Sequence, residues 1–172
     1  MNMNNLRPQD IYVLLALAAA GDENTWTFER LANELGLSPS QIFRSLARAE
    51  LSHLFDKETR HVRTPELCEF LTHGIRYAFA AVAGRIQRGV PTAWKAPALT
   101  ELMNISGDDV YVWPAPNGTM RGIAIEPLHP AALPAAGENE RLYTLLALTD
   151  ILRLGSARER RVASDELTRL LR

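Results

Sequence analysis

The segment from residue 26 to residue 50, WTFERLANELGLSPSQIFRSLARAE, constrains the fold more than any other part of the chain. Thr27 is a good N-cap for a first helix, and Gly36 suits the left-handed position that ends it. Ser38 then starts a second helix, with proline at the first helical position and Gln41 completing an S-x-x-Q capping box. The segment therefore predicts two short helices joined by a tight turn, a helix-turn-helix.

Further helix and strand signals surround this motif. Apolar residues at helical spacing predict a first helix over residues 8–20 and a long helix from residue 64 to about residue 83. Two short strands, near residues 53–55 and 60–63, are expected on either side of the polar turn DKET. These signals predict a small hairpin between the helix-turn-helix and the long helix.

The second half of the chain has a different character. Residues 84–137 hold seven of the ten prolines, and the sequences VYVW (110–113) and RGIAI (121–125) predict the two strands of a second hairpin. A short helix is expected near residues 98–103. Two more helices are expected at about residues 138–154 and from the Ser156 capping box to about residue 171. The predicted fold class is mainly α with small β (α+β), with a domain boundary between residues 83 and 84.

Composition and charge exclude several kinds of protein. The net charge is −1, so nucleic-acid binding would require a local basic patch. The single cysteine, Cys68, excludes an internal disulfide and a four-cysteine zinc site. Because the sequence has neither an N-terminal signal nor a long apolar span, we expect a cytoplasmic protein without a membrane segment.

The order helix, helix-turn-helix, short β-wing, helix resembles that of the winged-helix transcriptional regulators of the MarR and ArsR type. The resemblance covers roughly residues 6–79, and LANELGLSPSQIFRSL is its most specific part. It implies a dimer that binds double-stranded DNA, with the second helix of the motif in the major groove and the wing beside the backbone. Phe43 departs from the pattern, since such regulators often carry a small polar residue there.

Helical spacing assigns an outward face to the second helix of the motif. With Ile42, Leu46 and Ala49 turned to the core, the polar residues between them would face solvent. An arginine fork matches the acceptors of guanine, a glutamine can pair with adenine, and serines at a helix start suit phosphates. A solvated helix face without a ligand is the alternative. The predicted DNA-binding residues of this helix and the wing are Ser38, Ser40, Gln41, Arg44, Ser45, Arg48, Lys57, Arg60 and Arg63.

A second basic run follows the motif. Residues 70–100 contain Arg76, Arg85, Arg88 and Lys95 but no acidic residue. This run would extend a DNA footprint, or it would form a positive rim around a dimer interface or around a surface for an acidic partner. The sequence does not choose between these readings.

The sequence contains no catalytic motif. No glycine-rich phosphate loop, nucleophile elbow or HExxH spacing occurs, so we do not expect an enzyme. Cys68 and His73, with His53 and His61, are conceivable ligands of a metal sensor. However, Cys68 falls on the core side of its predicted helix, and neither a metal nor a cofactor is expected.

Two features of the second half concern partners. The apolar residues of 142–154 cover most of a helix circumference, so this helix must be buried on more than one side. A homodimer core would bury it, and burial inside the monomer is the alternative. Trp94, Tyr111 and Trp113 would line an effector pocket or pack a core, and aromatic residues in strands usually pack.

Together these features predict a DNA-binding transcriptional regulator, a homodimeric repressor that controls its own gene. Residues 84–172 would serve dimerisation, or would bind a protein partner or a small-molecule effector. The alternative function is a protein-interaction module, such as an antitoxin or an adaptor built on a winged helix.

Overall fold

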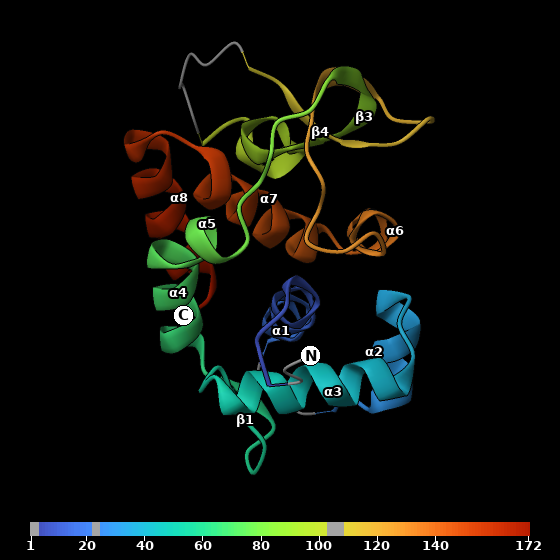
Figure 1. Cartoon of the computed structure of the whole chain (residues 1–172), viewed down its shortest axis with the longest axis vertical. Helices are drawn as coiled ribbons and strands as arrows, with labels where there is room; N and C mark the ends of the chain where they lie inside the picture. Colours follow the sequence, from blue (N-terminus) through green and yellow to red (C-terminus); the bar gives the residue numbers. More distant parts are fainter. Residues whose placement is uncertain (1–3, 22–24, 103–108) are drawn as a thin grey trace.

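The computed structural model describes residues 4–21, 25–102 and 109–172 (Figure 1). This part of the chain is mainly helical and of the α+β class, with eight α-helices and small two-stranded and three-stranded sheets. The elements in chain order are α1 (Pro8–Ala20), α2 (Phe28–Leu35), α3 (Pro39–Leu51), β1 (Phe55–Asp56), β2 (His61–Val62), α4 (Thr64–His73), α5 (Ile75–Ala78), β3 (Ile86–Thr92), the 3-10 turns η1 (Ala93–Lys95) and η2 (Pro97–Leu99), β4 (Tyr111–Pro114), β5 (Met120–Ala124), α6 (Ala132–Glu138), α7 (Glu140–Leu154) and α8 (Ala157–Leu170).

The first three helices begin and end where the capping signals predicted. The Thr27 hydroxyl accepts a hydrogen bond from the Arg30 N–H at 3.1 Å, and Gly36 ends α2 with a φ of 65°. The Ser38 hydroxyl accepts from the Gln41 N–H at 3.2 Å, while the Gln41 side chain accepts from the Ser38 N–H at 2.8 Å. These bonds satisfy N–H groups that helical hydrogen bonds do not reach, so local sequence fixes the turn between α2 and α3.

The predicted hairpin after α3 is confirmed, although each strand has only two residues. Phe55 lies opposite Val62, and Asp56 lies opposite His61. The Asp56 carboxylate accepts hydrogen bonds from the N–H groups of Thr59 and Glu58, which shapes the turn. These hydrogen bonds, the one from Thr59 foremost, lower the pKa of Asp56.

The long helix predicted over residues 64–83 is wrong in its second half. α4 ends before Gly74, and the short α5 covers Ile75–Ala78 only. The Phe79 carbonyl accepts a hydrogen bond from Nε of Arg153 in α7 at 2.8 Å, instead of continuing the helical ladder. The Phe79 ring also packs edge-on against Phe70 with a centroid distance of 6.1 Å. Contacts with distant residues therefore end the helix where local propensity would continue it.

The second predicted hairpin is wrong. β4 and β5 form near the expected positions but run parallel to each other, and β3, for which no strand was predicted, pairs antiparallel with both. The three strands close into a small barrel. A Cβ on Gly89 would lie 2.2 Å from the Trp113 carbonyl oxygen, and one on Gly118 would lie 2.2 Å from the Gly89 carbonyl. Only glycine permits such close strands. Of the short helix predicted at 98–103, the turn η2 is present, and residue 103 lies outside the described residues.

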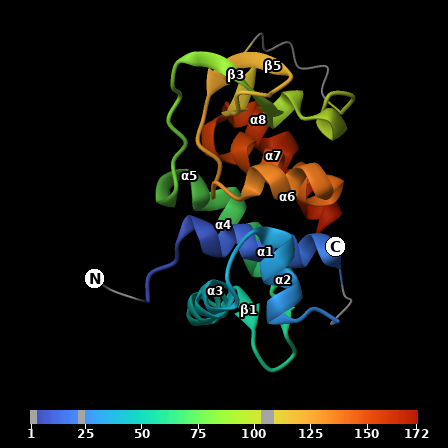
Figure 2. The ribbon, with the colours of Figure 1, turned by 90° about the vertical axis from the view of Figure 1, so that its right-hand side faces the viewer.

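α7 is the central helix of the molecule (Figures 1 and 2). All residues from Leu145 to Arg153 are buried, and α1, α5, α6, α8 and the turn η1 pack around the helix. α7 begins at Glu140, two residues later than predicted, with Asn139 as its cap, and α8 follows from the Ser156 cap as expected. The burial that α7 requires is thus achieved within one chain. The homodimer stays a prediction, but α7 no longer supplies a reason for it.

One hydrophobic core extends across the two predicted domains. The buried side chains of α1 and α7 belong to the same cluster. The Tyr12 hydroxyl in α1 lies 3.0 Å from the Leu35 carbonyl and 3.2 Å from the Ala131 carbonyl, so it bridges α2 and the segment before α6. The boundary predicted after residue 83 falls in the connection between α5 and β3, and packing continues across it.

A buried carboxylate fastens the barrel to α7. Asp150 accepts hydrogen bonds from Thr92 of β3 at 2.7 Å and from the Trp113 indole of β4 at 2.8 Å. Arg153 completes the site with a 2.8 Å ion pair. No helix among the described residues has the length and the apolar character needed to cross a membrane.

Candidate nucleic-acid interface

α2, α3 and the β1–β2 hairpin form the end of the molecule opposite the barrel (Figures 1 and 2). Of the nine residues predicted to bind DNA, five are exposed there, namely Ser38, Ser40, Arg44, Lys57 and Arg63. Gln41 and Arg60 are half-buried, and Ser45 and Arg48 are buried. Five of the nine residues are therefore accessible at one end of the molecule, and the other four are half-buried or buried.

The assignment of Arg48 and Ser45 to the DNA surface is wrong. Arg48 is only 7% exposed. Its guanidinium donates two hydrogen bonds to the Asp10 carboxylate, from Nε at 2.8 Å and from Nη2 at 2.7 Å, and this bonding raises the pKa of Arg48. The Ser45 hydroxyl accepts from Gln9 at 2.8 Å. The cause is α1, which covers a wider arc of α3 than the apolar stripe alone indicated.

The ion pair gives Arg48 a different role, which is to hold α3 in place. A bidentate arginine–carboxylate pair fixes both the distance and the angle between its two helices. The signal for it was present in the sequence, because Asp10 is the only charged residue within the apolar helix PQDIYVLLALAAA. A buried acid requires a cationic partner, and Arg48 is that partner.

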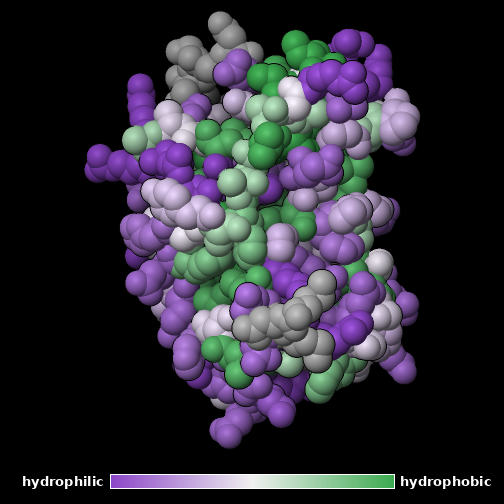
Figure 3. Space-filling model, viewed as in Figure 1, coloured by the Kyte–Doolittle hydropathy of each residue, from purple (hydrophilic) through white to green (hydrophobic). Residues whose placement is uncertain are grey.

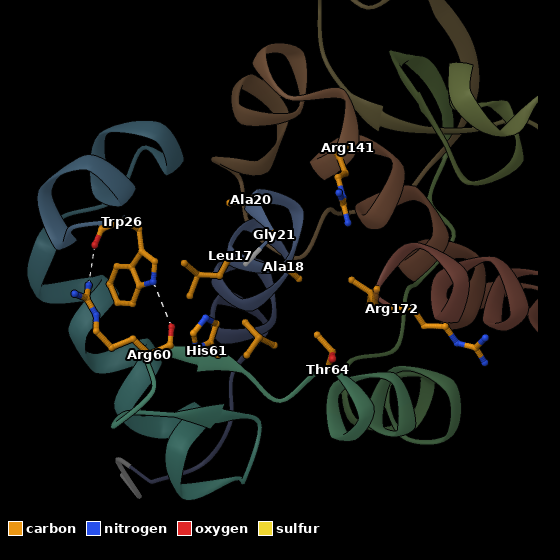
Figure 4. Close-up of a pocket in the computed structure, with 12 residues that line it drawn as sticks. Leu17, Ala18, Ala20, Gly21, Trp26, Arg60, His61, Thr64, Arg141 and Arg172 are labelled. Atoms are coloured by element: carbon orange, nitrogen blue, oxygen red, sulfur yellow. Dashed lines mark hydrogen bonds between the residues drawn. The ribbon is translucent and has the colours of Figure 1, made fainter. Parts of the chain in front are cut away.

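Arg60 is also engaged inside the molecule. Its guanidinium lies over the Trp26 ring, 4.1 Å from the centroid, and donates to the Trp26 carbonyl at 2.7 Å (Figure 4). The Trp26 indole in turn donates to the Arg60 carbonyl at 3.4 Å. Arg60 therefore ties the hairpin to the start of α2, and its contact with DNA stays a prediction.

Apolar side chains occupy much of the outward face of α3. Phe43 is 59% exposed and Leu51 is 60% exposed. The Phe43 ring packs against Phe28 of α2 with a centroid distance of 6.1 Å. Together with Trp26 and Phe55 these rings line a groove of about 370 Å³ between α2, α3 and the hairpin. In the sequence Phe43 stands out as a departure from the regulator pattern, but the groove was not predicted.

The charge of this surface is close to balanced. With Arg48 neutralised by Asp10, the exposed charged residues of α3 are Arg44 and Glu50. Over residues 38–63, four cationic side chains remain against three acidic ones. The second basic run does not extend this surface, because Arg85 and Arg88 lie at or next to β3, at the opposite end of the molecule from α3 (Figure 2).

A second cavity, of about 510 Å³, separates the end of α1 from α7 and the start of α4 (Figure 4). Arg141 points into it from α7, and His61 and Thr64 border it from the hairpin and α4. None of the twelve described residues in its lining is acidic. Arg141 and His61 are suited to an anionic small molecule, although the Arg141 guanidinium already donates to the Leu170 carbonyl at 2.8 Å.

The residues considered as metal ligands, and the aromatic residues considered for an effector pocket, pack in or against the core or lie apart from one another. Cys68 packs partly against the core, and burial raises the pKa of its thiol. Among the described residues, no three His, Cys, Asp or Glu side chains are placed to hold a metal ion. Trp113 is buried in the core, and Trp94 and Tyr111 pack against the core.

Comparison with protein-family models, curated proteins and solved structures gave no significant match to this chain.

Proposed function

We propose that this protein is a winged-helix DNA-binding regulator that inserts the N-terminal half of α3 into the major groove. The observation that carries the proposal is the α2–turn–α3 unit. Both helices of this unit have side-chain N-caps, and α1 packs against α3 on the side away from solvent. Ser38, Ser40 and Arg44 are exposed along the first half of α3. Recognition helices contact base edges with N-terminal residues in this way.

The contacts divide into two kinds. Arg44 is the base-reading residue, because its fork matches the O6 and N7 acceptors of guanine. Ser38 and Ser40, at the start of the helix, and Lys57, in the turn of the hairpin, would contact phosphates. Arg48 would act only through α3, by holding its angle to α1.

The test is a fluorescence-anisotropy titration with the duplex upstream of the protein's own gene and a random duplex of equal length. Arg44→Ala should cost about 1–3 kcal/mol on the specific duplex and reduce discrimination between the two. Lys57→Ala should weaken both equally and lower the salt dependence by about one unit of slope. Arg158→Ala, an exposed arginine of α8, is the matched control. Absence of binding by the wild-type protein at low salt would refute DNA recognition.

The exposed apolar groove favours a second function, a protein-interaction module. Phe43 and Leu51 are costly to expose, and large exposed apolar side chains mark docking sites more often than DNA surfaces. Phe43→Ser separates the two functions. A DNA-binding protein should keep most of its affinity for DNA with this substitution, because serine is a small polar residue. A protein-binding module should lose its partner.

A further inference from the structure

The connection between α5 and β3, with the residues on either side of it, exposes three large apolar side chains. Tyr77 is 79% exposed, Val82 is 79% exposed and Ile86 is 66% exposed. The chain between them, Ala-Phe-Ala-Ala-Val-Ala-Gly-Arg, has one polar side chain. Figure 3 shows the result as a green and pale-green band that follows this connection up toward the barrel. We call residues 77–86 the apolar strip.

The backbone in the middle of the apolar strip is also unpaired. Residues 80–83 belong to no helix or strand, and their N–H and C=O groups make no hydrogen bond with any described residue. Pairing begins only at Gly84, whose N–H donates to the Ala124 carbonyl at 2.8 Å. Farther along, β5 borders the first half of β3, whereas β4 pairs only from Gly89 onward. One backbone edge is therefore open from residue 80 to residue 87, long enough to accept a strand.

Cationic side chains lie along the apolar strip and the start of β3. Arg76 stacks on Tyr77 at 5.5 Å, and Arg85 lies within the strip. Arg88, whose Nη1 also donates to the Gly118 carbonyl at 3.2 Å, lies opposite Arg121 in the β3–β5 ladder. The strip itself contains no acidic residue, and none occurs in the sequence from residue 70 to residue 100. Because the like-charged pair Arg88–Arg121 is unfavourable on its own, an anionic group between the two arginines would stabilise it.

The charges select the occupant. In a two-fold dimer the same surface meets itself, so four arginines would face four arginines. A duplex would neutralise the arginines but would leave Val82 and Ile86 against phosphates. A protein segment with alternating apolar and acidic side chains satisfies the apolar strip, the arginines and the open backbone edge together. From this juxtaposition we infer that the apolar strip binds an extended, acidic and apolar segment of a partner protein as an added strand.

The test uses three labelled synthetic peptides of about nine residues with the same alternating valine frame and glutamate, glutamine or lysine at the positions between. The glutamate peptide should bind at least about tenfold more tightly than the lysine peptide, with the glutamine peptide between them. Val82→Asp and Arg85→Glu should each weaken it by about tenfold or more. N-methylation of the peptide N–H groups on the edge that faces the strip should abolish binding, because that edge can no longer donate to the backbone of the strip. Arg158→Glu, which alters an exposed residue of α8, should leave the affinity unchanged.

Three outcomes would overturn the inference. The first is equal binding of the glutamate and lysine peptides, or binding that Val82→Asp does not weaken. The second is a wild-type dimer in sedimentation that Val82→Asp converts to a monomer, since the occupant would then be a second copy. The third is a loss of DNA affinity in Arg85→Glu but not in Val82→Asp, which would make the strip part of a DNA surface. The α3 variants of the DNA titration do not alter the strip, so either proposal can fail alone.

Discussion

At the scale of single residues, the pair Arg48–Asp10 shows how burial changes the meaning of a charge. The charges are paired and hydrogen-bonded at 2.7–2.8 Å, with Ser45 also within 3.4 Å of the guanidinium. A buried pair of this kind contributes little net stability compared with an apolar pair, but loss of one partner leaves the other charge uncompensated. The pair therefore specifies the position of α3 on α1 more than it strengthens the fold.

Arg48→Ala should lower the free energy of unfolding by about 3–5 kcal/mol, because Asp10 would remain buried without its partner. Arg44→Ala, on the exposed face of the same helix, should change it by less than about 0.5 kcal/mol. Urea unfolding followed by circular dichroism measures both. Similar losses for the two variants would mean that Arg48 is not a buried, paired group.

His129 gives the molecule a specific pH dependence. Its ring stacks on Tyr12 at 5.6 Å, and Nδ1 accepts a hydrogen bond from the Ala131 N–H at 3.1 Å. Burial lowers the pKa of His129 below its ordinary value of 6.5. The unfolded chain therefore takes up this proton at a higher pH than the folded chain does. As pH falls from about 6.5 through the folded pKa, stability should be lost.

His129→Asn isolates this effect. The asparagine oxygen can accept the same Ala131 N–H, as in an Asx turn, but does not titrate. Between about pH 8 and about pH 5 the wild-type protein should lose more unfolding free energy than the variant. The difference between the two urea-unfolding series removes the contribution of the other histidines. Parallel series would show that the His129 pKa is not lowered by folding.

At the scale of elements, the barrel depends on glycines more than on strand propensity. Gly89→Ala should cost about 3 kcal/mol or more, because its Cβ would lie 2.2 Å from the Trp113 carbonyl and 2.8 Å from the Val112 side chain. Gly137→Ala is the control, since nothing lies within 4 Å of a Cβ there. Because Gly137 is in α6, alanine should leave stability unchanged or raise it by up to about 1 kcal/mol. Thermal unfolding monitored by tryptophan fluorescence measures both, and equal midpoints would contradict the close approach.

The elements that could be predicted from the sequence are those with local causes. Caps at Thr27, Ser38 and Ser156 lie within three residues of the groups they bond, so their helices were located to within a residue or two. The barrel was missed because β3 pairs with strands about 20 to 35 residues away, and because the two strand sequences indicated a hairpin although β4 and β5 run parallel. The burial of Arg48 was missed for the same reason, because its partner Asp10 lies 38 residues earlier in the sequence.

At the scale of the whole molecule, α7 decides how the parts are joined. Asp150 and Arg153 link it to the barrel and to the carbonyls of Phe79 and Glu126. Its apolar residues pack against α1, which in turn holds α3 through Arg48. The candidate interface and the apolar strip thus lie on opposite sides of one continuous core. A change of packing at α7 would reach both surfaces.

A substitution in α7 tests whether that core needs a second chain. Leu148 is fully buried within the monomer, so Leu148→Ala should cost about 2–5 kcal/mol from lost contacts and the cavity left behind. If α7 is buried by its own chain, the unfolding midpoints of the wild-type protein and the variant should not move over a roughly fifty-fold range of protein concentration. A dimer core built on α7 would make both midpoints rise with concentration, because dissociation would accompany unfolding. Urea unfolding at the two concentration limits, with sedimentation velocity in the native buffer, distinguishes these cases. If the wild-type midpoint depends on concentration and Leu148→Ala removes that dependence, α7 lies in a dimer interface. This result would contradict the monomeric core.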